Sequence, residues 1–295
     1  MRRLTLLLAA SICAYSLVEF PAPAFAEEGK EEEKKPEGVK YSATVGATLT
    51  QTNFVDWAEG GEDALSYVLN LKGGLSEERT NDNWKIEGAL GFGQTKVGDE
   101  ETKVSVNEVK VEGQYNYKLP KQWSTYTAAG FRSAIVTGYD YTADPKREKA
   151  SFNDPGYYTF SLGGKKHLSQ EPILLTSRAG LGLKYTTAQE NFGFGYADDP
   201  DTPELDKDKL ETGIDSVTEL KAQISENLLC ESKLVLFSAF EHLDVWDVLW
   251  ETAVKARVNK YISTELYLVF LFDKDVSGRV QRFQMLGIGL SYSIF

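Results

Sequence analysis

The feature that most constrains this chain is a period-two alternation of apolar and polar residues over unusually long segments. In segment 245–259, Trp246 and Trp250 share one face, while Glu251 and Lys255 share the other. This alternation is typical of β-strands whose two faces meet different environments. Many segments exceed both the ~5–6 residues of soluble strands and the ~9–11 that cross a bilayer at a tilt. Twelve segments follow the pattern, near 39–51, 64–77, 83–95, 102–117, 123–136, 156–168, 172–186, 210–226, 228–242, 245–259, 261–273 and 279–295.

The connections between these segments alternate in length. The short ones lie at 78–82, 118–122, 169–171, 227 and 260, and the long ones at 52–63, 137–155 and 187–209. The connections at 96–101 and 274–277 are intermediate, and the short one at 243–244 breaks the alternation. Short turns at one rim and longer loops at the other are typical of outer-membrane barrels. We therefore predict an all-β, closed, antiparallel up-and-down barrel of about twelve strands, with short periplasmic turns and both termini on that side.

The polar faces are expected to line a lumen. Open sheet edges do not persist in lipid, and twelve strands enclose more volume than an eight-stranded barrel fills with side chains. We expect the apolar faces to meet acyl chains, whereas a soluble periplasmic β protein would invert the two faces. The predicted lumen residues are Glu108, Lys110, Glu112, Arg178, Lys184, Asp215, Glu219, Lys221, Asp247, Glu251, Lys255 and Arg257.

The N-terminal region precedes the predicted barrel, which covers 39–295. Residues 1–26 have a positive start, an apolar run and an Ala-Phe-Ala end, as expected of a cleaved secretory signal peptide. Residues 27–38 are rich in Glu and Lys and are predicted to be a disordered leader. The formal net charge of −12 disfavours a nucleic-acid partner, and two cysteines exclude a disulfide framework.

The aromatic residues and the C-terminal strand indicate which molecules the barrel is expected to contact. Aromatic residues gather near strand ends, as in interfacial girdles, so outer-membrane lipids and lipopolysaccharide are the expected surroundings. The chain ends at Phe295, and a terminal aromatic residue resembles the signal by which barrels are delivered to their assembly machinery. Phe295 falls on the opposite parity from the apolar face of its strand, which includes Leu290 and Tyr292.

Two loop features were weighed as binding sites. Trp57 with Gly60 and Gly61 is interpreted as a tight turn at the barrel mouth rather than a ligand contact. The acidic stretch containing Asp198, Asp199 and Asp201 is a weak Ca²⁺ candidate, since two prolines interrupt it and it lacks the EF-hand spacing. We predict no metal and no cofactor.

His167 and Ser169 form a His-x-Ser pair that could belong to a hydrolytic site. The predicted topology places the pair at the periplasmic rim, and no orienting Asn or Asp lies nearby in the chain. No phosphate loop, dinucleotide fingerprint or nucleophile elbow is present. We therefore expect no catalytic residue.

Several motifs together resemble one family of bacterial outer-membrane barrel proteins known only as a domain of unknown function. They are the Trp-x-x-Gly-Gly motif at Trp57–Gly61, the turn Asn81–Trp84, the Asp-Val-x-Trp-Glu motif at Asp247–Glu251 and the segment Asn259–Tyr261. The resemblance implies fold and location but no chemistry. We expect a passive channel or small-solute conduit of unknown substrate. The alternatives are a non-conducting structural or surface-interaction barrel and, less favoured, a lipid or glycan hydrolase of the outer membrane.

Overall fold

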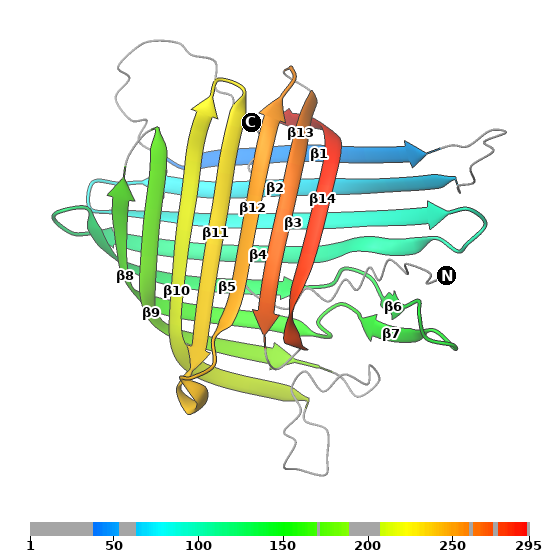
Figure 1. Ribbon diagram of the computed structural model, residues 1–295. Helices are drawn as coiled ribbons and strands as arrows, with labels where there is room; N and C mark the ends of the chain where they lie inside the picture. The colour runs from blue at the N-terminus through cyan, green and yellow to red at the C-terminus, as the bar shows by residue number, and fades with distance from the viewer. Residues whose placement is uncertain are drawn as a thin grey trace.

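The computed structural model describes residues 38–52, 63–169, 172–188, 207–259, 262–273 and 277–293, in which twelve antiparallel strands form a closed barrel (Figure 1). The barrel strands are β1 (Lys40–Thr52), β2 (Ala64–Glu78), β3 (Asp82–Val97), β4 (Lys103–Lys118), β5 (Trp123–Ser133), β8 (Gly156–Ser169), β9 (Ile173–Thr187), β10 (Asp208–Ser225), β11 (Leu228–Ala239), β12 (Asp247–Arg257), β13 (Ile262–Asp273) and β14 (Ser277–Ser293). The predicted all-β barrel fold is confirmed. No helix among the described residues is long and apolar enough to span a membrane.

The two ends of the barrel differ in their connections. One end, called here the short-turn end, joins strands through two to four residues. At the other, the long-loop end, the connections have five to 22 residues, apart from the three between β13 and β14. The predicted exception at 243–244 was wrong: β11 stops at Ala239, and the connection to β12 is the seven-residue segment 240–246, which contains the short 3-10 helix η2 (Phe240–His242).

The loop predicted at 137–155 contains a small hairpin of β6 (Gly138–Asp140) and β7 (Arg147–Ala150). The hairpin is held beside the outer end of β4, where the Val104 amide donates to the Tyr141 hydroxyl at 3.1 Å. Lys146 also pairs with Glu101 at 2.6 Å. Asp140 accepts hydrogen bonds from Thr142, which lower the pKa of this carboxyl to about 2. Because this pKa is depressed, the hairpin keeps the Asp140 contacts until the pH falls through about 2.

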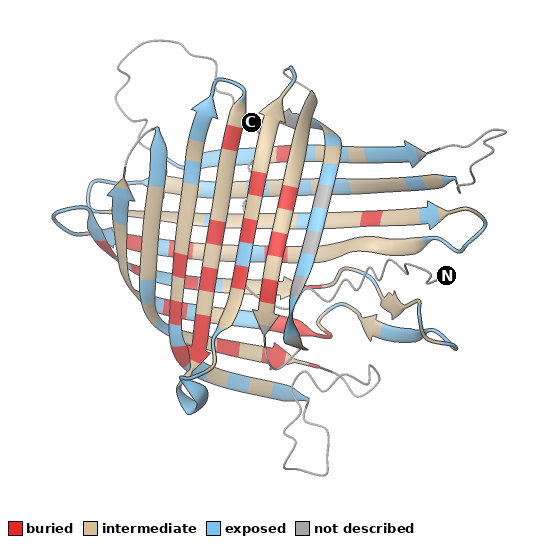
Figure 2. Ribbon diagram, viewed as in Figure 1, coloured by how far each residue is buried: buried red, intermediate tan, exposed pale blue. Residues whose placement is uncertain are grey.

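The exterior of the barrel is apolar. Large apolar side chains alternate along the strands and point away from the lumen, and more than a third of the surface of each is exposed. They include Val45, Leu49, Leu69, Leu71, Ile86, Leu90, Val111, Tyr115, Phe160, Leu162, Leu181, Ile214, Trp250, Leu286, Ile288 and Leu290. The buried positions recur on the opposite parity, as the bands along β10–β13 show in Figure 2. This is the arrangement expected when lipid, not protein, covers the outer face.

The barrel is flattened into two walls. In Figure 1, strands β11–β14 pass in front of β1–β5 and cross them at a steep angle, and strands β8–β10 bend so that they join the two layers. We call the two groups of strands the β8–β14 wall and the β1–β5 wall. Gly163 and Gly180 are register partners of β8 and β9, and a Cβ on either glycine would collide with the backbone of the other strand. The two glycines therefore allow the close backbone approach at this pair.

The barrel closes between β1 and β14. Five residue pairs join these strands, from Thr44 with Ser293 to Thr48 with Gly289. The closure leaves no free edge strand in the described barrel, which satisfies the requirement that backbone groups in lipid be paired within the protein.

Candidate functional site

The inward face of the barrel carries a dense set of charged side chains. The predicted lumen residues lie on four strands: Glu108, Lys110 and Glu112 on β4; Arg178 and Lys184 on β9; Asp215, Glu219 and Lys221 on β10; and Asp247, Glu251, Lys255 and Arg257 on β12. Each occupies the inward parity of its strand, opposite the exposed apolar side chains. The strands thereby bring acidic and basic groups from both walls into one interior.

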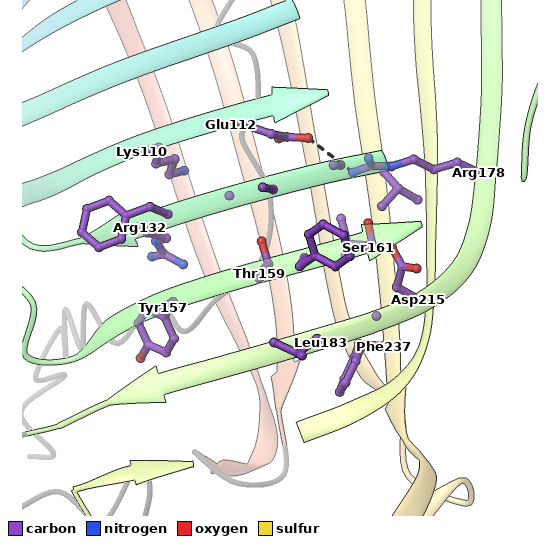
Figure 3. Close-up of a pocket in the computed structure, with 18 of the residues that line it drawn as sticks. Lys110, Glu112, Arg132, Tyr157, Thr159, Ser161, Arg178, Leu183, Asp215 and Phe237 are labelled. Carbon is purple, nitrogen blue, oxygen red and sulfur yellow. Dashed lines mark hydrogen bonds and ion pairs between the residues drawn. The ribbon is translucent and has the colours of Figure 1, made fainter. Parts of the chain in front are cut away.

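Glu112 is the centre of a bridge between the two walls. One of its carboxylate oxygens lies 3.4 Å from Nη2 of Arg178 on β9. The other lies 3.9 Å from Nζ of Lys233 on β11. All three side chains are 10–13% exposed. Since β4 belongs to the β1–β5 wall and the two bases to the β8–β14 wall, we call this contact the Glu112 bridge. Figure 3 shows Arg178 and Glu112 meeting above the cavity.

A second cluster lies beside this bridge on β4 and β5. Glu108 pairs with Lys110 at 2.8 Å and with Arg132 at 2.5 Å. The guanidinium of Arg132 lies 5.9 Å from the centroid of the Tyr157 ring. One acidic side chain is thus shared by two basic ones on this wall.

Lys184 organises a third cluster within the β8–β14 wall. Its ammonium lies 2.8 Å from Glu211 and 3.2 Å from Asp247. It also lies 5.3 Å from the centroid of the Phe237 ring. Lys184 is 3% exposed, so its charge is balanced almost entirely by protein groups.

Glu231 connects three further charges near the short-turn end. It pairs with Lys255 at 2.9 Å and with Lys221 at 3.6 Å. Lys255 also approaches Glu265 at 4.0 Å. Lys221 and Glu219 are the more solvated members of the predicted set, with side chains 45% and 39% exposed.

Arg257 lies at the short-turn rim. It donates hydrogen bonds to the side chain of Asn227 and to the carbonyl of Glu226. It therefore helps to close the turn between β10 and β11.

Two tyrosines supply hydrogen bonds to interior carboxyl groups. The Tyr126 hydroxyl donates to Asp215 at 3.1 Å, and the Tyr267 hydroxyl donates to Glu251 at 2.6 Å. Buried carboxyl groups require such partners, because an unsatisfied one costs free energy. The guanidinium of Arg178 stacks over the Tyr126 ring at 5.1 Å, which links this pair to the Glu112 bridge.

Several interior residues were not among the predicted lumen residues. The main ones are Lys72, Tyr126, Arg132, Glu211, Glu231, Lys233, Glu265 and Tyr267. Each lies on the inward parity of its strand, so the rule that identified Glu251 and Lys255 would have found them if applied to β2, β5, β11, β13 and the start of β10. The alternation rule predicts which residues face inward. It does not predict which of them meet across the lumen, because that depends on the flattening of the barrel.

Part of the interior is apolar. Leu249, Val269 and Leu271 are 2–3% exposed and lie on the inward parity of β12 and β13. The interior therefore combines ionic clusters with packed apolar residues. A cavity of about 80 Å³ lies within it.

Most of the other predicted sites lie outside the described residues. The Trp57, Gly60 and Gly61 motif, the acidic residues Asp198, Asp199 and Asp201, and Phe295 fall outside the described residues, as do segments 1–26 and 27–37. Within the described ranges, no group of three or more His, Cys, Asp or Glu side chains could hold a metal ion. The Ser169 hydroxyl donates to the carbonyl of Ile173 at 2.6 Å, at the short-turn end.

A family model described as "Protein of unknown function (DUF3078)" matches residues 49–139. The matched range contains the Trp57–Gly61 motif and excludes Asp247–Glu251. The expected resemblance to a family of unknown function is confirmed over this range. No curated protein matches the chain.

Solved structures with a similar architecture are bacterial outer-membrane barrels. The translocator domain of the autotransporter NalP from Neisseria meningitidis is 10% identical, with 86% of this chain and 87% of that one covered and a TM-score of 0.41. An outer-membrane channel from Pseudomonas putida F1 is 11% identical, with coverages of 91% and 99% and a TM-score of 0.43. The toluene transporter TodX of Pseudomonas putida is 9% identical, with coverages of 88% and 89% and a TM-score of 0.36.

Proposed function

We propose that this chain is an outer-membrane β-barrel acting as a small-solute conduit, whose lumen is closed at rest by the Glu112 bridge. The observation that carries the proposal is the meeting of Glu112 with Arg178 and Lys233 from the opposite wall. Long side chains that join opposite walls narrow the passage between them. The apolar exterior supports the membrane location.

The composition of the interior favours a conduit over a purely structural barrel. Replacing buried ion pairs by well-packed apolar residues is often neutral or stabilising, so ion pairs are not needed to hold the barrel together. Ionisable groups at membrane depth commonly mark solute or ion pathways. The clusters around Glu108, Glu112, Lys184 and Glu231 fit that pattern.

Planar-bilayer recording of the purified barrel tests this proposal. We expect the wild-type protein to give small, infrequent current steps, because the Glu112 bridge must part before ions pass. The control is the same bilayer with detergent alone. The conduit would be contradicted if neither the wild-type barrel nor the Glu112→Ala variant, which lacks the bridge, gave a current step at any voltage.

The second candidate is a non-conducting structural or surface-interaction barrel. The packed inner residues Leu249, Val269 and Leu271 favour it, because an open pore would expose such side chains to water. Silence of both proteins in the recording is the result that this alternative predicts.

The proposal includes the route to the membrane. A signal peptide at 1–26 would direct export, and the final strand ending at Phe295 would engage the barrel-assembly machinery. The exposed outward residues of β14, Leu286, Ile288 and Leu290, support a lipid-facing final strand. Lipopolysaccharide and outer-membrane lipids would then surround the barrel.

A further inference from the structure

One lysine lies on the outer face of the barrel, close to the short-turn end. Lys166 has the same parity on β8 as Phe160 and Leu162, which point outward and are exposed. It lies three positions before Ser169, the last residue of β8, so its Cα is within about 10 Å of the end of the strand. A cationic side chain is costly at the midplane of a barrel's lipid face and is tolerated near the interfaces. Lys166 therefore lies at the level expected for lipid headgroups.

The side chain of Lys166 is held over an aromatic ring. Trp123 on β5 is its register partner, and the ammonium lies 5.0 Å from the centroid of the indole ring. A Cβ placed on Gly164 would lie 3.8 Å from Cζ3 of the same ring, so the indole also covers this part of β8. A cation is attracted to the face of an aromatic ring, and tryptophan is typical of the membrane–water interface. The ring thus holds the ammonium at the outer surface of the rim.

The charge of Lys166 is not balanced by a neighbouring acidic side chain. Within the described ranges, no carboxylate lies within 4.0 Å of its ammonium, and the Trp123 ring is its one polar or aromatic contact. Lys118 at the same rim differs, because it pairs with Glu78 at 2.5 Å. Lys121 in the β4–β5 turn is exposed and adds a second positive charge. This part of the rim is therefore positive, and Lys166 itself is partly exposed.

Exposed apolar and aromatic side chains border this positive part of the rim. They are Tyr117 and Leu119 at the end of β4 and Leu168 on β8. Leu119 is held beside Trp123, since its amide donates to the Trp123 carbonyl at 2.8 Å. A basic group bordered by apolar side chains is complementary to a molecule that has an anionic head and apolar tails.

We propose that Lys166 and Trp123 bind the headgroup of an anionic phospholipid at the short-turn rim. The lipid phosphate would accept a hydrogen bond from the Lys166 ammonium, and the acyl chains would lie along the outer face of β8, beside Phe160 and Leu162. A charge-assisted hydrogen bond of this kind is stronger than a neutral one. The site rests on the proposed membrane location of the barrel, but lipid binding needs no conduction.

Native mass spectrometry of the purified barrel, titrated with phosphatidylglycerol in detergent, tests the site. The wild-type barrel should bind one phosphatidylglycerol more tightly than it binds phosphatidylcholine with the same acyl chains. Lys166→Gln should weaken phosphatidylglycerol binding about fivefold, the effect expected of one basic side chain near a membrane surface. Lys166→Arg should retain the binding, because a guanidinium also binds phosphate and stacks on an aromatic ring.

The matched control is Lys118→Gln, which removes a lysine of the same rim that is already paired with Glu78. It should leave phosphatidylglycerol binding unchanged. Heat-modifiable gel migration verifies that each variant still folds.

Two further measurements separate the lipid from its headgroup alone. Glycerol phosphate carries the phosphate without acyl chains, and it should not bind at concentrations at which phosphatidylglycerol saturates the site. Trp123→Leu keeps an apolar side chain at the rim but removes the ring beneath the ammonium, so it should weaken phosphatidylglycerol binding.

Four results would overturn the proposed lipid site. They are the absence of a preference for phosphatidylglycerol, equal binding by the wild type and Lys166→Gln, an equal loss in Lys166→Gln and Lys118→Gln, and binding of glycerol phosphate as tight as that of the lipid. A barrel that binds phosphatidylglycerol through Lys166 but never gives current steps contradicts only the conduit. A conducting barrel without this preference contradicts only the lipid site.

Discussion

Replacing Glu112 with alanine is expected to destabilise the barrel by about 3 kcal/mol and to make its conductance larger and anion-selective. The substitution leaves Arg178 and Lys233 without the carboxylate that joins them, and both side chains are only 10–11% exposed. Removing one partner of a buried ion pair typically costs about 3–5 kcal/mol. The distances of 3.4 and 3.9 Å place this case at the lower end of that range.

Two measurements check the Glu112→Ala prediction. Urea unfolding of the barrel in lipid vesicles gives the loss of stability, and planar-bilayer recording gives the conductance and the reversal potential in a salt gradient. The control is Glu219→Ala: Glu219 also pairs with Lys233, at 3.4 Å, but its side chain is 39% exposed. Exposed pairs contribute about 1 kcal/mol or less. Equal conductance in the wild type and in Glu112→Ala would show that the bridge does not close the passage.

Replacing Leu181 with arginine is expected to destabilise the barrel by about 2–4 kcal/mol, the cost of a cationic side chain at the midplane of a barrel's lipid face. Leu181 lies near the middle of β9, points outward and is 57% exposed. Its register partners are Ile214 on β10 and Leu162 on β8, so an arginine there would have only apolar outward neighbours across both strands.

The same urea titration in lipid vesicles checks the Leu181→Arg prediction. The matched control is Leu174→Arg on the same strand: Leu174 has the opposite parity, is 39% exposed and lies close to the short-turn end. Because lumen-facing substitutions are tolerated better than lipid-facing ones, it should cost about 1 kcal/mol or less. A Leu181→Arg barrel as stable as the control would mean that water, not lipid, covers the outer face.

The inward and outward faces of the strands could be predicted from the sequence, because the alternation of apolar and polar residues is a local property. In β12, Trp250 faces outward and Glu251 inward, as alternation predicts. The ends of strands were less accessible: the predicted segment 123–136 stops at Ser133, where the Ser133 hydroxyl accepts a hydrogen bond from the Asn153 amide. Asn153 lies in a loop 20 residues further along the chain. The alternation within a strand therefore cannot predict this hydrogen bond.

The pairing of charges across the lumen could not be predicted from the sequence in this way. Glu112 was predicted to face inward, yet nothing in its local sequence indicates that Lys233, far away in the chain, lies opposite. Their meeting depends on the flattening of the barrel into two walls. The position of the Arg178 guanidinium over the Tyr126 ring, at 5.1 Å, is likewise a property of three-dimensional packing.

The central claim is that apolar side chains face lipid and charged side chains face the lumen. Its most direct test is a spin-label scan of β12, Asp247–Arg257, with one cysteine at a time in a Cys230→Ser background and the barrel reconstituted in lipid. Oxygen, which concentrates in the bilayer, should relax labels strongly at Val248, Trp250, Thr252, Val254 and Ala256 and weakly at the odd-numbered positions between them. Maxima at the odd-numbered positions, or no alternation, would contradict the account.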